Sequence, residues 1–412
     1  MRVTTLRRGT LRHSPMLCEV NKETSVRHTH ENNNKHEEIG TCKSRKSFMI
    51  GFTQPLRPVS NNNNNNNRYS YSCFATTSTC SSFISYRNVS LRTQFRVPVF
   101  PFVVLCSANS FYDFMVEPVP GDELARTISC NGKVSLKSLV ATGLVDGAAR
   151  IQETKPVATA ALGRTLICAL LLSAGKKSDE TVNIEFRGSG PLRTVVAVAD
   201  GLGQVRGYVG DRNVDLPPNR KGKLDVSRAI GEGIVRVTRN HYTWKQPYQG
   251  LTRIVSGEVA EDIANYLYQS EQIFSAVAAG VFVKPDGSVS AAGGYLVQLL
   301  PGASEETLKL LEETLYSLEY SPTEMIRLGM NSTDIVNKLA EGLNIQQVHK
   351  SRPLYRCHCS IDRVERTVAL LPKDEIDQLV ASIGTLQVKC EFCNRTYQLT
   401  PPEIEQIYQD RK

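Results

Sequence analysis

The clearest chemistry in this sequence lies in two short cysteine motifs near its C-terminal end. The first is Cys357-His358-Cys359 and the second is Cys390-Glu391-Phe392-Cys393. Each motif supplies two sulfurs from one short turn, and a tetrahedral thiolate site requires that arrangement. We therefore predict that Cys357, Cys359, Cys390 and Cys393 bind one Zn²⁺ ion; the alternative is two independent dithiols. Four sulfur ligands leave no position for water, so a hydrolytic zinc is not expected, and His358 is expected to point away from the ion.

A metal ion held by four thiolates is either structural or sensitive to oxidation, and the motifs leave both interpretations open. Thiolates that bind a metal are already deprotonated, so they react with peroxide or hypochlorous acid, and close neighbours then form disulfides through a sulfenic acid. Oxidation would release the metal and unfold whatever it stabilises. A domain of roughly sixty residues with few large apolar side chains needs such a metal, which contributes on the order of 10 kcal/mol.

The segments around the cysteines predict a zinc knuckle. Two short strands, 386–389 and 396–399, are expected on either side of the second motif, with Asn394 in the left-handed conformation that asparagine tolerates. Thr400-Pro401-Pro402-Glu403 is a capping box that begins the last helix. Between the two motifs the apolar spacing predicts two helices, and the second is expected to end at Gly384.

Residues from about 121 onward have the composition of a globular α+β domain, a core with an antiparallel sheet and helices. The alternation of Val182, Ile184 and Phe186 predicts a strand with one buried face. Further strands are expected at 192–198, 205–209, 233–238 and 252–256, and helices at 134–145, 156–174 and 258–270.

Three clusters rich in glycine and glutamine interrupt these elements, and we interpret them mainly as backbone geometry. Residues 246–250 are expected to break the ladder between strands, 268–272 to end a helix, and 293–302 to form a glycine turn followed by a strand. His241 is the only histidine between residues 121 and 347, so no Ser/His/Asp triad is indicated. The glycine-rich pieces also lack the features of a nucleotide-binding loop. We therefore expect a protein that is not an enzyme.

Short amphipathic helices follow the core. The first begins after Ser304, the second at Ser321 and the third at Ser332, which is expected to run to Leu343. Helices this short are not stable alone in water, so their apolar faces must pack on the core or on the zinc-binding region. The main residues of these faces are Leu308, Leu311, Leu315, Ile335 and Leu339.

The N-terminal part of the chain differs in composition from the rest. Residues 1–110 contain 15 Lys and Arg but 5 Asp and Glu, and residues 39–112 contain no acidic side chain. Such a basic, hydroxyl-rich segment does not fold and is typical of an organelle transit peptide; a disordered basic tail is the alternative. We expect a chloroplast location, with the mitochondrion as the alternative. No membrane span is expected, since no run of about eighteen apolar residues occurs.

Several motifs resemble those of one known protein family in their order and spacing. Cys-x-Cys-Ser stands at 357–360, Leu-Pro-x-Asp-Glu-Ile at 371–376 and Val-x-Cys-Glu-Phe-Cys-x-x-x-Tyr at 388–397. Together with the core segments, these motifs resemble the Hsp33 family of redox-regulated holdase chaperones, from about residue 121 to the end. The core segments that carry the resemblance are 188–192, 205–208, 246–250, 270–272 and 294–302.

The resemblance implies an ATP-independent chaperone with a core at 118–303, a helical linker at 304–352 and a C-terminal zinc-binding domain at 353–412; the leader, 1–117, lies outside the family pattern. In such a protein the reduced, zinc-bound form is inactive. Oxidation would join Cys357 to Cys359 and Cys390 to Cys393, release Zn²⁺, and loosen the zinc-binding domain and then the linker. The active form would be a homodimer that holds unfolding client proteins. The surface expected to bind them comprises Leu308, Leu311, Leu315, Ile335 and Leu339.

A zinc-ribbon protein that binds nucleic acid is the alternative from another class. It would need a basic stripe with aromatic residues beside the knuckle, whereas residues 357–412 contain more acidic than basic side chains. A thiol oxidoreductase would need Cys-x-x-Cys at a helix N-terminus, but the second motif here follows a strand. We therefore expect neither nucleic acid nor membrane among the partners. Cys130 and Cys168, outside both motifs, are expected to be buried packing residues.

Overall fold

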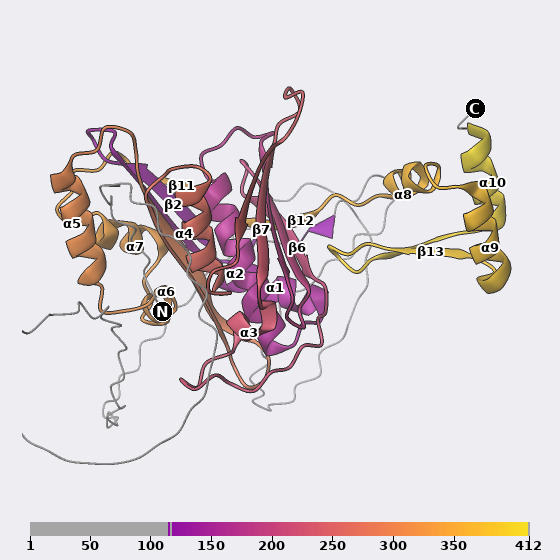
Figure 1. Ribbon diagram of the computed structural model, residues 1–412, viewed down its shortest axis with the longest axis horizontal. Helices are drawn as coiled ribbons and strands as arrows, with labels where there is room; N and C mark the ends of the chain where they lie inside the picture. The colour runs from indigo at the N-terminus through magenta and orange to yellow at the C-terminus, as the bar shows by residue number, and fades with distance from the viewer. Residues whose placement is uncertain (1–113, 116–117, 411–412) are drawn as a thin grey trace, which may run out of the picture. The chain divides into compact units, whose positions relative to one another are not determined.

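The computed structural model describes residues 114–115 and 118–410, all within one compact unit (Figure 1). The predicted leader lies outside the described residues, except for residues 114–115. The strands are β1 (Phe114–Met115), β2 (Glu123–Ile128), β3 (Val134–Val140), β4 (Thr181–Gly188), β5 (Thr194–Asp200), β6 (Gln204–Val209), β7 (Gly233–Asn240), β8 (Tyr248–Arg253), β9 (Ser275–Val283), β10 (Val289–Leu299), β11 (His349–Ser351), β12 (Leu354–Cys357), β13 (Leu386–Lys389) and β14 (Thr396–Leu399). The helices are α1 (Thr142–Gln152), α2 (Pro156–Ser173), α3 (Val226–Ile230), α4 (Val259–Gln269), α5 (Glu305–Tyr316), α6 (Pro322–Arg327), α7 (Ser332–Leu339), α8 (Ile361–Val368), α9 (Lys373–Ile383) and α10 (Pro401–Asp410). This mixture of helices and antiparallel sheets confirms the predicted α+β class.

One layer of the core is a seven-stranded sheet in the order β1-β12-β6-β5-β4-β7-β8. Its neighbouring strands are antiparallel, except that β12 runs parallel to β6. The predicted meander corresponds to β4, β5 and β6 and is confirmed. In β4 the side chains of Val182, Ile184 and Phe186 are fully buried, as their alternation predicted. The strand predicted at 252–256 begins earlier, at Tyr248.

Residues 246–250 do not break the strand ladder, contrary to the prediction. Tyr248 pairs with Arg239, and Gly250 pairs with Val237, both inside the sheet. A side chain at position 250 would not fit, because a Cβ there would lie 2.4 Å from Ser270 Oγ and 2.6 Å from a ring carbon of Tyr266. The strand therefore continues through the glycine so that the end of α4 can pack closely on β8.

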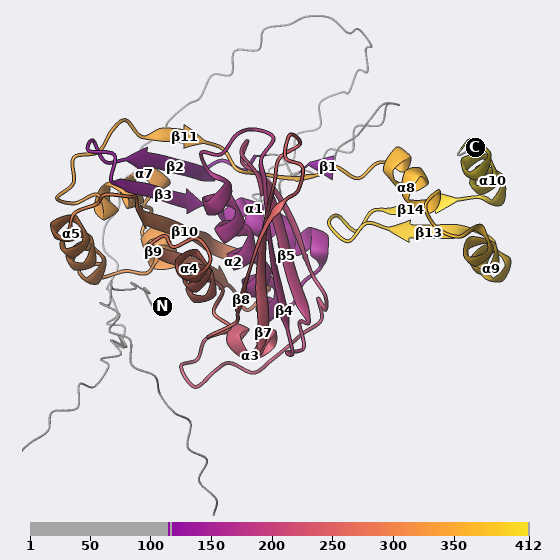
Figure 2. The same cartoon turned by 45° about the horizontal axis from the view of Figure 1, so that its top comes forward.

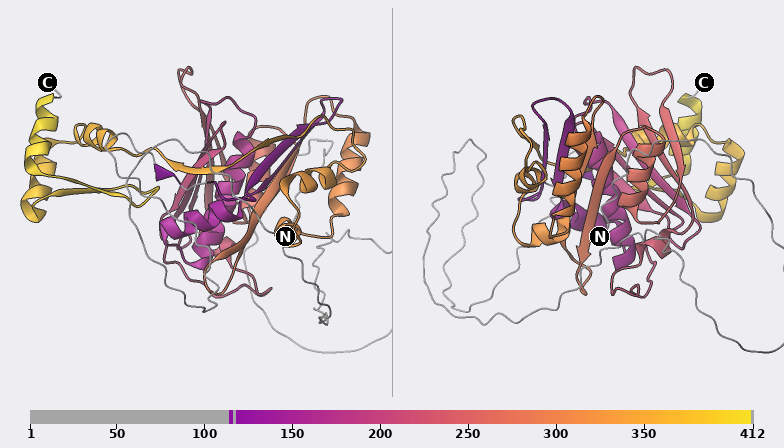
Figure 3. Two further views of the ribbon diagram at one scale, coloured as in Figure 1. Left: turned by 180° about the vertical axis from the view of Figure 1, so that it is seen from behind. Right: turned by 60° about the vertical axis from the view of Figure 1, so that its left-hand side comes forward.

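The second layer is a five-stranded antiparallel sheet in the order β11-β2-β3-β10-β9, in which early and late strands lie side by side (Figure 3). The helix predicted at 134–145 is wrong, because this stretch forms β3 and only then turns into α1. Its buried residues include Val134, Leu136, Leu139 and Val140. This spacing fits both a helix and a strand buried on two faces, and pairing with β2 and β10 decides for the strand.

The predicted glycine turn at 293–294 is also wrong, because both residues lie inside β10. Gly293 pairs with Val140 on one side and with Gly280 on the other. A Cβ at position 293 would lie 2.3 Å from the carbonyl oxygen of Leu139 and 2.5 Å from Cδ1 of Ile326. The glycine therefore permits α6, which carries Ile326, to lie directly on the strand.

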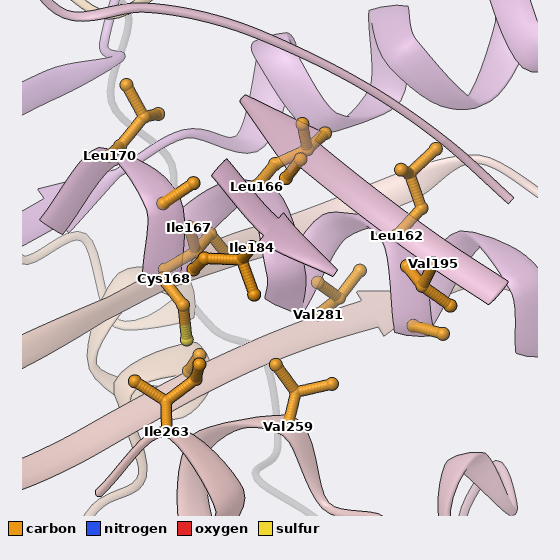
Figure 4. Close-up of a cluster of buried hydrophobic side chains, with 14 of the residues drawn as sticks. Leu162, Leu166, Ile167, Cys168, Leu170, Ile184, Val195, Val259, Ile263 and Val281 are labelled. Atoms are coloured by element: carbon orange, nitrogen blue, oxygen red, sulfur yellow. The ribbon is translucent and has the colours of Figure 1, made fainter. Parts of the chain in front are cut away.

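Helix α2 contacts both sheets, through β5 and β6 of the first and β9 and β10 of the second. Figure 4 shows Leu162 and Leu166 of α2 with Val195 of β5 and Val281 of β9 in the main apolar cluster. Of the helices in the described residues, α2 alone has the length and hydropathy of a membrane span, and 89% of that stretch is buried inside the protein. Its apolar surface is therefore used by the core. Cys168 on this helix is fully buried, as predicted.

Cys130 is exposed, so the prediction that it is a buried packing residue is wrong. It lies in the turn between β2 and β3, where its backbone N–H donates to the carbonyl of Asn344. The backbone of Cys130 is thus fixed while the thiol faces solvent.

The linker helices pack on the second sheet, so of the two surfaces predicted for their apolar faces they use the core (Figure 2). Leu311 and Leu315 of α5 are buried, as are Ile335 and Leu339 of α7, whereas Leu308 is half-buried. Their sheet partners include Leu136, Tyr295 and Val297. The predicted caps are present: Ser304 caps α5 and Ser321 begins the capping box of α6. Helix α7 is capped by Asn331 and ends at Leu339, earlier than predicted.

The elements around the cysteines agree closely with the sequence analysis. Strands β13 and β14 have the predicted bounds, and Asn394 has φ +57°. Helix α9 is closed by Gly384 as its C-cap, and the Thr400 backbone N–H donates to Glu403 at the start of α10. These elements share a small apolar cluster formed by Val364, Val368, Ile376, Leu386, Leu399 and Ile404.

Asp122 gives the fold a pH dependence that can be measured. Its carboxylate accepts hydrogen bonds from the backbone N–H groups of Gly143 (3.0 Å) and Leu144 (2.7 Å) at the start of α1. Burial raises the pKa of Asp122 from 3.8 to about 6. The folded state then holds the proton more tightly than the unfolded chain, so stability falls as pH rises from about 4 to about 6, by on the order of 2–3 kcal/mol.

Asp122→Asn is therefore expected to flatten the pH dependence of stability in this window. Urea unfolding of both proteins at pH 4 and pH 7 measures the change. An equal loss of stability in the variant and the unmodified chain would contradict the assignment to Asp122.

Candidate metal centre

The four predicted cysteine ligands come together at one point. The Sγ atoms of Cys357, Cys359, Cys390 and Cys393 all lie within 4.8 Å of one another. The Sγ–Sγ distance is 3.6 Å between Cys357 and Cys390 and 3.3 Å between Cys359 and Cys393. His358 is not part of this group. Four sulfurs at this spacing can surround one tetrahedral metal ion.

Short backbone elements position each sulfur. Cys357 is the last residue of β12, and Cys359 precedes Ser360, the N-cap of α8. Cys390 follows β13, and its N–H donates to the carbonyl of Arg395 (2.9 Å) across the knuckle. The N–H of Asn394 donates to the carbonyl of Cys390 (2.9 Å), which closes the turn with Asn394 in the left-handed region. A tight turn of this kind brings Cys390 and Cys393 to one side.

Hydrogen bonds within the group lower the pKa of two thiols and raise the pKa of the other two. The bond with Cys357 lowers the pKa of Cys359 to about 6 and lowers the pKa of Cys390 well below its ordinary value. The bond with Cys359 raises the pKa of Cys357, and the bond with Cys357 raises the pKa of Cys393. The Tyr397 hydroxyl also donates to Cys359 Sγ at 3.1 Å. The lowered pKa values of Cys359 and Cys390 favour the thiolate form, which is the form that binds a metal cation.

The knuckle turn is hydrogen-bonded to the core through α1. Gln152 Nε2 donates to the carbonyl oxygens of Glu391 and Phe392, both at 2.8 Å. In the opposite direction, Asn394 Nδ2 donates to the carbonyl of Ile151. Gln152 is only 4% exposed, so these bonds lie away from solvent. They hold the second cysteine motif against the end of α1.

Tyr355 connects the first cysteine motif to the core. Its ring is 1% exposed and belongs to the main apolar cluster. Its hydroxyl lies 3.0 Å from the carbonyl oxygen of Gly207 in β6 and 2.5 Å from that of Phe392, and burial raises its pKa, so it remains a donor. Because Tyr355 also pairs with Val205 in the β12–β6 ladder, Cys357 stands at the end of a strand of the core sheet.

The contribution of Gln152 can be tested by substitution. Gln152→Ala removes two hydrogen bonds that together contribute about 1–2 kcal/mol to docking of the knuckle. We expect amide hydrogen exchange at 391–394 to become roughly five- to thirtyfold faster. Gln398→Ala, at an exposed position of β14, is the matched control and should leave the exchange unchanged. Equal exchange in the two variants would show that Gln152 does not hold the knuckle.

The structure combines an α+β core, short helices packed on that core and a four-cysteine centre near the C-terminal end. This is the architecture of an Hsp33-type molecular chaperone. The family model described as Hsp33 protein matches residues 122–400. The 33 kDa chaperonin of Symbiobacterium thermophilum is 41% identical over 292 residues, which are 71% of this chain and 98% of the relative. That of Desulforamulus reducens is 37% identical over 286 residues, 69% of this chain and 97% of the relative.

A solved structure agrees with these relatives. The crystal structure of the 33 kDa chaperonin from Thermotoga maritima superimposes with a TM-score of 0.66 at 31% identity, covering 71% of this chain and 99% of the other. The chain belongs to the Hsp33 family. Its function is therefore that of a chaperone rather than an enzyme, and unfolded proteins are the partners that this function implies.

The sequence predicts the four sulfurs but not the side chains that dock them. Tyr355 had a weak signal, since it alternates with Cys357 and both prove to be buried on one strand. Gln152 had none, because 239 residues separate it from Glu391. The five residues predicted to bind clients belong to linker helices α5 and α7, and four of them are buried in the cluster on the second sheet.

Proposed function

We propose that this chain is an ATP-independent holdase chaperone controlled by oxidation. The reduced form holds one Zn²⁺ on Cys357, Cys359, Cys390 and Cys393 and is inactive. Oxidation joins Cys357 to Cys359 and Cys390 to Cys393 and releases the metal. The observation that supports this proposal most is the approach of four Sγ atoms within 4.8 Å of one another, with one of them at the end of a core strand.

Zinc is the metal that best fits this donor set. Four thiolate sulfurs suit Zn²⁺, which prefers tetrahedral sulfur coordination in structural sites. When bound, the ion would offset two of the four thiolate charges and cross-link β12 to the knuckle. The cluster of small elements around it contains few large apolar residues, so these elements depend on that cross-link.

The linker helices supply the surface that we propose to bind clients. Helices α5, α6 and α7 contain 12, 6 and 8 residues, lengths that are not stable alone in water. Their buried leucines and isoleucine therefore stay covered only while the helices remain docked. Undocking would expose Leu308, Leu311, Leu315, Ile335 and Leu339 together with the sheet face beneath them.

The oxidised form is proposed to be a dimer, and the chain is proposed to be imported into an organelle. The oxidised chain, with its apolar surface uncovered, would associate as a homodimer while it holds clients.

The leader, 1–117, would direct the protein to the chloroplast, with the mitochondrion as the alternative. Import of the full chain and of a chain without residues 1–117 into isolated chloroplasts and mitochondria tests this part, and import into neither would contradict it.

The redox proposal is tested by measuring bound zinc and chaperone activity together. Purified reduced protein should contain one zinc ion and should not suppress thermal aggregation of an unrelated client. After mild peroxide treatment the zinc should be free in solution and aggregation should be suppressed. Equal suppression by both forms, or reduced protein without zinc, would contradict the proposal.

A further inference from the structure

The four cysteines differ in their exposure to solvent, and the sequence motifs do not predict this difference. Cys357 is 2% exposed and Cys393 is 6% exposed, whereas Cys359 and Cys390 are half-buried. Each of the two motifs thus combines one buried and one half-buried cysteine. The buried members face the core-side contacts, since Cys357 continues from Tyr355 and Cys393 follows the docked carbonyl of Phe392.

A cavity of about 220 Å³ opens beside the two half-buried cysteines. Its lining includes Cys359 and Cys390, while Cys357 contributes to the wall but is nearly inaccessible and Cys393 does not line it. Because one water molecule occupies about 30 Å³ of liquid volume, the cavity can admit a molecule the size of hydrogen peroxide.

The side chains that line this cavity include positively charged groups, which can stabilise an anion that an oxidant releases. Two positively charged residues, Arg206 and Arg363, line the cavity. The Nε atom of Arg206 is buried and has no hydrogen-bond partner among the described residues. Its ring neighbour is Phe392, whose centroid lies 5.0 Å from the guanidinium carbon. The positive charge of Arg206 and Arg363 can stabilise an oxygen that gains negative charge in the cavity.

We propose that this cavity is the site at which a small peroxide meets the metal centre, and that Cys359 and Cys390 are the sulfurs oxidised first. This inference rests on the proposed redox function and adds to it the point of attack. The thiolate sulfur of Cys359 or Cys390 attacks one peroxide oxygen, the O–O bond breaks, an S–O bond forms and hydroxide leaves. The sulfur loses two electrons, which the peroxide gains.

The buried cysteine of each motif then resolves the sulfenic acid. The thiolate of Cys357 attacks the sulfur of oxidised Cys359, and Cys393 attacks oxidised Cys390; in each case the S–O bond breaks, an S–S bond forms and a second hydroxide leaves. Two thiolates and one hydrogen peroxide thus give one disulfide and two hydroxide ions. The buried sulfurs need no access to solvent for this step, because their partners lie in the same motif.

Trapping of sulfenic acids in the full, zinc-loaded chain tests the assignment. The protein is oxidised with less than one equivalent of hydrogen peroxide in the presence of dimedone and digested with trypsin. Cleavage after Arg356 and Lys389 gives peptides 357–363 and 390–395, each with one half-buried and one buried cysteine. Fragmentation of these peptides is expected to show about fivefold or more adduct on Cys359 and Cys390 than on Cys357 and Cys393.

Blocking the cavity provides an independent measurement. Thr367 lies on the exposed side of α8 and lines the cavity, so Thr367→Phe should slow zinc release by peroxide about fivefold or more at unchanged zinc content. Leu370→Phe, 77% exposed and outside the lining, is the control and should release zinc at the normal rate.

Several results would overturn the inference. Adducts that fall mainly on Cys357 or Cys393, adducts spread evenly over the four cysteines, or equal zinc release by the two phenylalanine variants would do so and leave the proposed redox function intact. A chain whose cysteines all resist peroxide would overturn both.

Discussion

Cys393→Ser is expected to yield a chain that purifies without zinc and whose elements from α8 to α10 are digested rapidly by protease. Cys393 is almost fully buried in the four-sulfur group, and a serine hydroxyl does not ionise at neutral pH to replace the thiolate. Four-ligand zinc sites contribute on the order of 10 kcal/mol, so loss of one ligand removes most of the stability of these elements. The variant should also hold clients without peroxide.

Cys130→Ser is the matched control for this substitution. It makes the same chemical change at an exposed cysteine outside the metal centre, so zinc content and protease resistance should equal those of the unmodified chain. Zinc content is measured by atomic absorption, and cleavage is followed from the C-terminal end. A Cys393→Ser protein that kept its metal and its protease resistance would contradict a structural role for the centre.

Ile335→Ala is expected to release the linker while the metal stays bound. Ile335 of α7 is fully buried against the second sheet, and truncation of such a side chain costs about 2–4 kcal/mol. An eight-residue helix has little stability of its own, so the cost falls mainly on docking of the linker. The reduced, zinc-loaded variant should therefore suppress aggregation of a client without peroxide.

Leu328→Ala is the control for the linker. Leu328 is the C-cap residue of α6 and is 64% exposed, so its truncation should change stability by less than about 0.5 kcal/mol and leave the reduced protein inactive. Hydrogen exchange in α2 should remain slow in both variants, which shows that the core is intact. If Ile335→Ala left the reduced protein as inactive as Leu328→Ala, the linker would not be the element that covers the client-binding surface.

Local sequence was sufficient for the features that depend on neighbouring residues. The two cysteine motifs, the knuckle strands, Asn394 and the cap residue Ser304 were all predicted, because each is specified within about ten residues of chain. The same holds for the amphipathic faces of α5 and α7. For this reason the four cysteines that could hold a metal ion follow from the sequence alone.

Tertiary structure decided the features that depend on contacts between segments far apart in the chain. The stretch 134–140 became a strand because β2 and β10 pair with it, although its apolar spacing also fits a helix. Gly250 and Gly293 lie inside strands because neighbouring elements approach too closely for a side chain. No local pattern records such pairings, since their partners lie far away along the chain.

The same physical reason applies to the four-cysteine group. Its four cysteines follow from spacing alone, but the burial of each cysteine depends on β12 joining the core sheet and on the contacts of Gln152 with the knuckle. Those contacts join residues that are more than a hundred positions apart. The cysteines that could hold a metal ion were therefore predicted from the order of residues, whereas the burial of each cysteine was decided by long-range packing.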